Sequence, residues 1–173
     1  MVTMMQPLAS MLNQSLRQYR GQVNILEWDA QQLMGHYTDP IQVLDELAHH
    51  LKLDSCTLQR LFGKSLFYFI VENGDRLLDS VHSSFELFRH PGTVLHLEIA
   101  ELYHDHTPPR FTILQWQPNK MILEYQSSLP FAHVCHGFLT ASSEYFAESI
   151  VIHQQLINGA LNHAHFTLTK IKE

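Results

Sequence analysis

The chain has 173 residues, 45% of them apolar, with 11 basic and 17 acidic side chains and a formal net charge of -6. This length suits one domain with a sizeable core, since typical domains run to roughly 100 to 200 residues. The few Lys and Arg residues are scattered, which disfavours a nucleic-acid surface because such a surface needs a basic stripe. No stretch approaches the roughly 20 apolar residues of a spanning helix, and no signal-peptide pattern opens the chain, so we expect a soluble, cytoplasmic protein. Cys56 and Cys135 form no CxxC pair, which is typical of a reducing compartment.

The first part of the chain predicts helices, because apolar residues recur there at helical spacing. The predicted helices cover residues 7–20, 39–51, 55–73, 75–88 and 94–103.

The second part predicts antiparallel strands around one more helix. After residue 109 the apolar period changes from about 3.6 to 2. The segments 111–116 and 121–127 flank a short turn and predict a hairpin, and residues 132–148 return to a helical pattern. Segments 150–157 and 163–171 predict a second hairpin, since the Asn-Gly pair between them favours a type I′ turn. Helices grouped first and strands later indicate an α+β domain.

His96 lies inside the predicted helix VLHLEIAELY, among apolar residues. A neutral imidazole in such surroundings can ligate a metal or a haem iron. From this local context alone, a core histidine bonded to a backbone carbonyl is the commoner case.

The strand MILEYQSS alternates, so Tyr125 and Ser127 point to one face while Ile122, Glu124 and Gln126 point to the other. Two hydroxyl groups on one face can donate hydrogen bonds to a carboxylate. Packing and local hydrogen bonds are the more frequent use of such residues.

Several segments together resemble the H-NOX (haem-nitric oxide/oxygen binding) family, as a divergent bacterial member. In HLEIAELYHDHTPPRF, His96 precedes Pro109 by thirteen residues, as the proximal histidine of that family precedes its Pro-Pro pair. LFGKSLFYFI resembles the FG-containing helix of the family, YQSS stands where the family has Tyr-x-Ser-x-Arg, and HVCHGFLTASSEYF resembles the next helix. The resemblance covers residues 37–173 and does not extend over 1–36.

The resemblance implies one haem-binding sensor domain over residues 1–173, with a helical distal part over about 1–70 and a sheet-bearing proximal part over about 71–173. His96 would be the axial ligand of haem b, Tyr125 and Ser127 would hydrogen-bond its propionates, and Pro109 would press on the porphyrin. The sixth iron position stays open to a diatomic gas. In the family, nitric oxide strains or breaks the bond from iron to histidine, and a helix shift is read by a partner.

The chain departs from the propionate motif at Leu129, where the family has an arginine. An arginine would give a bidentate, charged contact to a carboxylate. His133 could substitute for it, or the propionates could face solvent. An alternative hypothesis is therefore a haemless H-NOX-like interaction module, which binds a protein partner or an apolar ligand in the old cavity.

The resemblance also bears on the gas and the partner. Oxygen-binding relatives carry a distal tyrosine, which the stretch FAHVCHG lacks, so we expect nitric oxide or carbon monoxide to be preferred over oxygen. The chain ends with its last hairpin, without an output domain, so we expect a separate partner such as a histidine kinase or a cyclic-di-guanylate enzyme. We expect no enzymatic activity, since no nucleophile elbow, P-loop or HExxH is present. The candidates for the distal pocket are Leu66, Phe69, Ile70 and Val134.

A zinc site is a further candidate, because some bacterial relatives carry a cysteine-rich one between the penultimate helix and the last hairpin. Zinc accepts mixed cysteine and histidine ligands. Cys135, His153, His163 and His165 lie in the corresponding region. The alternative is that His163 and His165 line one face of an exposed strand.

Overall fold

The computed structural model describes residues 40–73, 78, 80–89 and 109–171, and the statements below concern these residues. They form an α+β fold, as the sequence predicts. Within them, no helix has the length and apolar content needed to cross a membrane. The elements in chain order are α3 (Pro40–Leu51), α4 (Ser55–Asn73), α5 (Ser84–Arg89), β1 (Arg110–Gln117), β2 (Lys120–Gln126), α7 (Ala132–Tyr145), β3 (Ile150–Ile157) and β4 (Ala160–Lys170).

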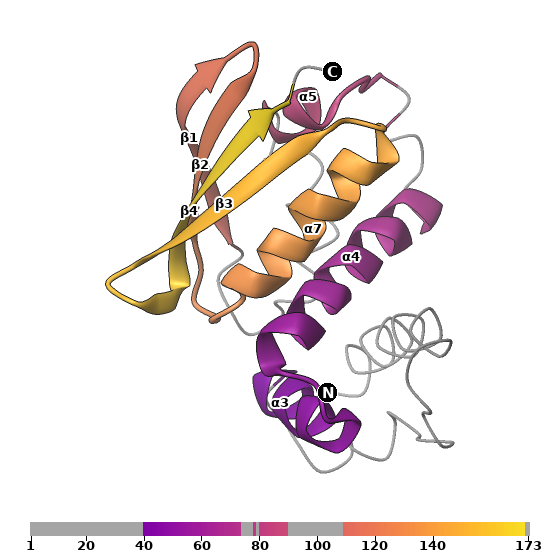
Figure 1. The fold of residues 1–173 in the computed structure, drawn as a ribbon, viewed down its shortest axis with the longest axis vertical. Helices are drawn as coiled ribbons and strands as arrows, with labels where there is room; N and C mark the ends of the chain where they lie inside the picture. Colours follow the sequence, from indigo (N-terminus) through magenta and orange to yellow (C-terminus); the bar gives the residue numbers. More distant parts are fainter. Residues whose placement is uncertain (1–39, 74–77, 79, 90–108, 172–173) are drawn as a thin grey trace.

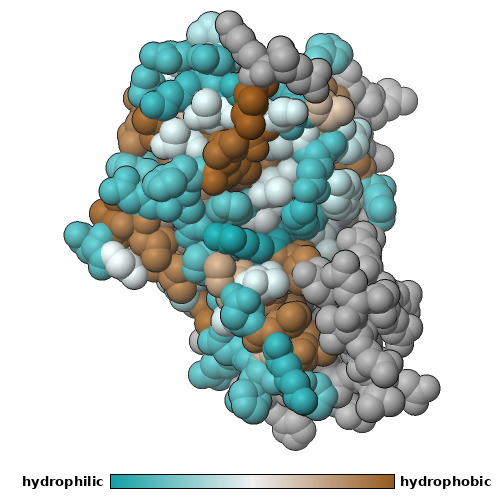
Figure 2. All heavy atoms as spheres, in the orientation of Figure 1, coloured by the Kyte–Doolittle hydropathy of each residue, from teal (hydrophilic) through white to brown (hydrophobic). Residues whose placement is uncertain are grey.

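The elements are arranged in layers, with the sheet, α7 and α4 following one another and α3 packed at one end of α4 (Figure 1). Figure 2, drawn in the same orientation, shows apolar side chains gathered where α3 meets α4. The layering follows from composition, because α4 is apolar over much of its circumference and needs cover on more than one side.

The sheet is antiparallel, with strand order β1-β2-β4-β3. Both predicted hairpins are confirmed. The turn between β3 and β4 has φ 54° at Asn158 and φ 70° at Gly159. Positive φ at both central residues is the requirement of a type I′ turn, which is why Asn-Gly is favoured there.

Strands β2 and β4 have one buried and one solvent-facing side. Leu123 and Tyr125 on β2 pair with Phe166 and Ala164 on β4, and all four are buried. The alternate residues point away from α7, since successive side chains of a strand lie on opposite faces. We call this second side the outer face of the sheet.

Two glycines let α4 and α7 approach closely. A Cβ atom on Gly63 would lie 1.9 Å from the Val134 carbonyl oxygen, and one on Gly137 would lie 1.8 Å from the Arg60 carbonyl oxygen. No larger residue fits at either position unless the backbone moves. This contact fixes the position of α7 between α4 and the sheet.

The helix predicted over 75–88 is shorter in the structure, where it begins at Ser84. The Ser83 hydroxyl accepts the Glu86 N–H at 3.1 Å, and the Glu86 carboxylate accepts the His82 N–H at 2.8 Å. A serine hydroxyl that accepts the N–H of the third helical residue is an N-cap, so Ser83 caps the helix that begins at Ser84. The Glu148 carboxylate also accepts the Ser84 N–H at 2.9 Å, which ties α5 to the loop after α7.

The helix predicted over 132–148 ends earlier, at Tyr145. Ala147 has φ 52°, and the Ala147 N–H donates to the Glu144 carbonyl oxygen at 3.1 Å. A left-handed residue directly after a helix closes its last turn and redirects the chain. The predicted helices over 7–20 and 94–103 lie outside the described residues.

Candidate functional site

A short turn after β2 holds Tyr125, Ser127 and Leu129 together. The Ser127 hydroxyl oxygen accepts the Leu129 N–H at 3.1 Å, and the Ser127 N–H donates to the Asn162 carbonyl oxygen at 2.9 Å. The Tyr125 hydroxyl donates to the Leu129 carbonyl oxygen at 3.4 Å. These bonds anchor the turn both to itself and to β4.

Tyr125 is only 2% exposed, and its ring lies against two phenylalanines. The ring centroids are 5.6 Å from Phe111 and 6.4 Å from Phe166. Tyr125 lies on the face of β2 opposite Glu124, as the alternation predicts, and the structure shows that this face is the buried one. Strands β1 and β4 fix its ring from either side.

Pro109 is buried directly before β1. Arg110 pairs with Gln126, and Phe111 pairs with Tyr125. The antiparallel register therefore puts Pro109 beside Ser127, one step beyond the last pair. The structure thus brings Pro109, Tyr125 and Ser127 to one corner of the sheet, which we call the β1–β2 corner. His96 lies outside the described residues.

Three of the four distal-pocket candidates are buried in the described structure. Leu66 and Ile70 on α4 are 6% and 2% exposed, and Val134 on α7 is 5% exposed. The side chain of Phe69 is not described. The glycine contact at Gly63 brings α4 against the backbone of Val134, so these residues belong to the interface between α4 and α7.

The β1–β2 corner has several features that a haem edge requires, namely apolar walls and hydroxyl donors for carboxylates. The Ser127 hydroxyl is half-buried, and among the described residues no acceptor for its proton is found. The third motif position differs, because Leu129 is 8% exposed and offers only apolar contact. Tyr125 and Ser127 therefore fit a haem propionate, and the arginine of the motif is absent.

Two histidines of α7 are uncharged at neutral pH, because their pKa values are lowered. Burial lowers the pKa of His133, and its Nδ1 has no hydrogen-bond partner in the described part of the chain. Burial, with the Arg60 charge nearby, lowers the pKa of His136 to about 4. His133 thus supplies a half-buried, neutral imidazole in the first turn of α7, four residues after Leu129.

The four residues suggested for zinc do not converge. Cys135 is buried on α7, where burial raises the pKa of its thiol, whereas His153, His163 and His165 belong to the outer face of the sheet. His163 and His165 do lie together, with Glu124 as their neighbour. Sequence reasoning placed Glu124 on the correct face but missed it as a partner, since the pairing of β2 with β4 decides which residues lie opposite one another.

The fold is shared with solved H-NOX structures. An unliganded Fe(II) H-NOX protein from K. algicida has a TM-score of 0.77 at 17% identity, covering 95% of this chain and 97% of that one. The H-NOX domain from Shewanella oneidensis, in an Fe(II)CO state, has a TM-score of 0.74 at 17% identity, covering 94% and 98%. An oxygen-binding H-NOX domain related to soluble guanylate cyclases has a TM-score of 0.71 at 12% identity, covering 98% and 96%.

Among curated proteins, none matches this chain significantly. The match to the family described as Haem-NO-binding extends over residues 10–154, well over half of the chain. It includes the segment from His96 to Pro109 and the segment that carries Tyr125 and Ser127. The chain therefore belongs to the Haem-NO-binding (H-NOX) family, whose domains are haem-based gas sensors.

Proposed function

We propose that this protein senses nitric oxide through a haem b held by His96, and that it regulates a separate signalling protein. The observation that supports the proposal most is that Pro109, Tyr125 and Ser127 lie together at the β1–β2 corner, within a chain segment that matches the family. Haem bound there would supply an iron atom with one position open to a diatomic gas.

The residues of the corner would each make a distinct contribution. Tyr125 and Ser127 would donate hydrogen bonds to the propionates of the haem, and Pro109 would contact the porphyrin beside the start of β1. His96 would bind the iron. Leu66, Ile70 and Val134 would supply apolar surface that excludes water.

Gas binding would shift the equilibrium between two conformations of this protein, and the signalling partner would respond to that shift. A gas can shift the equilibrium only if its affinity for the two conformations differs. Other members of the family motivate a histidine kinase or a cyclic-di-guanylate enzyme as that partner. Purified candidate enzymes, assayed with and without the nitric oxide complex of this protein, test this part of the proposal.

The first experiment is an absorption spectrum of the full chain reconstituted with haem, beside His96→Ala. We expect a Soret band that shifts when nitric oxide is added to the reduced protein. His96→Ala should lose haem or lose the spectrum of a histidine-ligated ferrous iron. A wild-type spectrum that does not depend on His96 would overturn the assignment.

A haemless interaction module is the second candidate, and the buried Leu129 in the place of the motif arginine favours it. In that case the wild type would take up no haem under conditions that load a related H-NOX domain. An apolar ligand or a protein would then occupy the interface between α4, α7 and the β1–β2 corner.

A further inference from the structure

Three side chains converge on the outer face of the sheet, on neighbouring strands. His163 and His165 on β4 direct their Nε2 atoms at the same carboxylate oxygen, Oε1 of Glu124 on β2. The distances are 2.9 Å from His163 and 3.7 Å from His165. One ligand atom from each of the three residues lies within 4.8 Å of the other two.

The backbone holds this arrangement in place. Glu124 pairs with His165 in the register of β2 and β4, and Gln126 pairs with His163. Ligands on paired strands of a sheet are held more rigidly than ligands on loops. The Gln126 amide nitrogen lies 3.4 Å from Glu124 Oε1, to which it donates, and 3.3 Å from His163 Nε2.

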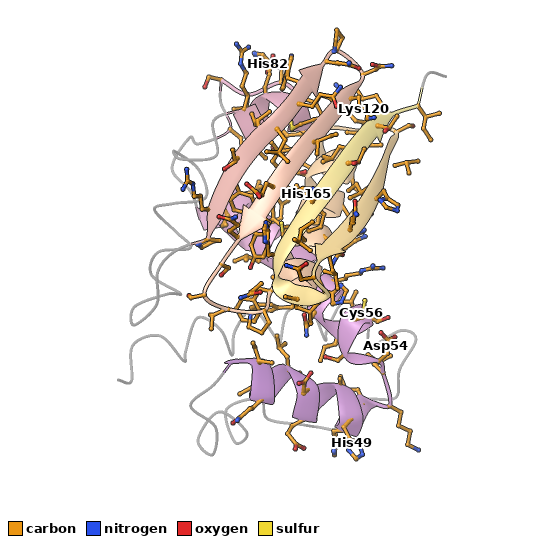
Figure 3. The ribbon with its side chains drawn as sticks, turned by 90° about the vertical axis from the view of Figure 1, so that its left-hand side faces the viewer. His49, Asp54, Cys56, His82, Lys120 and His165 are labelled. Carbon is orange, nitrogen blue, oxygen red and sulfur yellow. The ribbon has the colours of Figure 1, made fainter. Side chains whose placement is uncertain are left out.

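The group is accessible to an ion without being fully solvated. The side chains of His163, His165 and Glu124 are 32%, 31% and 21% exposed. In Figure 3 the outer face is turned to the viewer, with His165 near its centre.

The ligand set identifies the class of ion. Two imidazole nitrogens and one carboxylate oxygen suit first-row transition metals such as zinc, whereas magnesium and calcium prefer oxygen ligands alone. A tetrahedral zinc ion with bonds of about 2.0 to 2.1 Å separates its ligand atoms by about 3.3 Å. The observed spacings of 2.9 and 3.7 Å lie on either side of that value.

We propose that Glu124, His163 and His165 form a binding site for a divalent transition-metal ion, with zinc as its representative. Three protein ligands leave at least one position of the ion open to water or to a further ligand. The site shares two histidines with the zinc set suggested by the sequence, but it lies on the face of the sheet opposite Cys135. It uses none of the residues proposed to hold haem, so it can be tested with or without haem.

The test is a titration of the full chain, without an affinity tag and after removal of metals by a chelator, with Zn²⁺ against a chromophoric zinc indicator. We expect one tight site per chain in the wild type and none for Mg²⁺. Glu124→Gln, His163→Gln and His165→Gln should each weaken zinc binding by at least about 100-fold, since even changes beyond the ligands cost roughly 10- to 100-fold. His49→Gln is the matched control, because His49 lies on α3, far from His165 (Figure 3). This control should bind zinc as the wild type does.

The titration overturns the proposal if the wild type has no such site, or if the three variants bind zinc as tightly as His49→Gln does. A second measurement needs no variant. Paramagnetic Co²⁺ added to the ¹⁵N-labelled wild type should broaden amide signals around residues 124 and 163–165 first. Broadening centred elsewhere would contradict the site. His96→Ala should leave the zinc affinity unchanged, so failure of the haem proposal and failure of this one are distinguishable.

Discussion

At the end of β2, the Tyr125 hydroxyl donates to the Leu129 carbonyl oxygen over 3.4 Å. A bond of this length is weak, because N–H···O and O–H···O bonds are strongest well below about 3.2 Å. The Tyr125 ring, by contrast, is buried between Phe111 and Phe166. The ring therefore serves packing, whereas the hydroxyl is the group that would donate to a propionate in the proposed haem site.

We predict that Tyr125→Phe changes the free energy of unfolding of the haem-free chain by less than about 1 kcal/mol, the usual net value of one hydrogen bond. Haem should dissociate several times faster from this variant, because a propionate loses a donor. Transfer of haem to excess apomyoglobin measures the rate. Tyr145→Phe, at a side chain that is 45% exposed on α7, serves as the control. Equal rates for the two variants would remove Tyr125 from the binding site.

His136 predicts a pH dependence of stability. Burial is the main cause that lowers the pKa of His136 from 6.5 to about 4 in the folded chain. Between these two values the unfolded chain therefore binds a proton that the folded chain does not bind. The stability that the neutral His136 contributes is fully present above pH 6.5 and is lost as the pH falls towards 4. After allowance for the partial exposure of the ring, this loss in the free energy of unfolding is on the order of 1 kcal/mol.

Urea unfolding of the wild type and of His136→Gln between pH 7 and pH 4 tests this prediction. The variant lacks the titrating ring, so the gap between the two free energies should shift by that amount across the window. Parallel pH curves would show that His136 does not contribute.

At the scale of elements, the contact of α4 with α7 depends on backbone approach at Gly63 and Gly137. We predict that Gly63→Ala destabilises the fold by about 2 kcal/mol or more, because the new Cβ would lie 1.9 Å from the Val134 carbonyl oxygen. Helix propensity alone would favour alanine by roughly 1 kcal/mol. The sign of the measured change in thermal or urea unfolding therefore separates the two effects, and a stabilised variant would contradict the packing.

Element boundaries show a similar dependence on contacts. Helix α5 begins where the Ser83 hydroxyl accepts the Glu86 N–H and the Glu86 carboxylate accepts the His82 N–H. Glu148, from the loop after α7, accepts the Ser84 N–H at the same place. Apolar spacing alone extended this helix backward to residue 75. Periodicity reports which face is apolar, but the end of a helix depends on which groups satisfy its free N–H donors.

At the scale of the whole molecule, the fold does not select the gas. Structures with similar folds include one in an Fe(II)CO state and one described as oxygen-binding. We predict that the reduced, haem-loaded protein binds nitric oxide and carbon monoxide but forms no stable complex with oxygen, because the stretch FAHVCHG has no tyrosine to donate to it. Spectra of the reduced protein in air, under carbon monoxide and with nitric oxide test this, and a stable oxygen complex would contradict it.

The sequence by itself determined the α+β class, both hairpins, the type I′ turn and the face of β2 that carries Tyr125. These features depend on spacing and turn residues within a few positions of one another, so they can be read locally. Strand alternation also placed the hydroxyl groups of Tyr125 and Ser127 on one face, whereas Pro109 and the proposed propionate contacts came from the resemblance to the H-NOX family.

Only the tertiary structure decided which distant residues meet. The pairing of β1 with β2 puts Pro109 beside Ser127, and the pairing of β2 with β4 puts Glu124 opposite His165. The same structure separates Cys135 from the histidines with which the sequence had grouped it. The physical reason is that strand register and helix contact depend on the simultaneous burial of many side chains from separate segments, and a shift by one residue would turn every side chain to the other face.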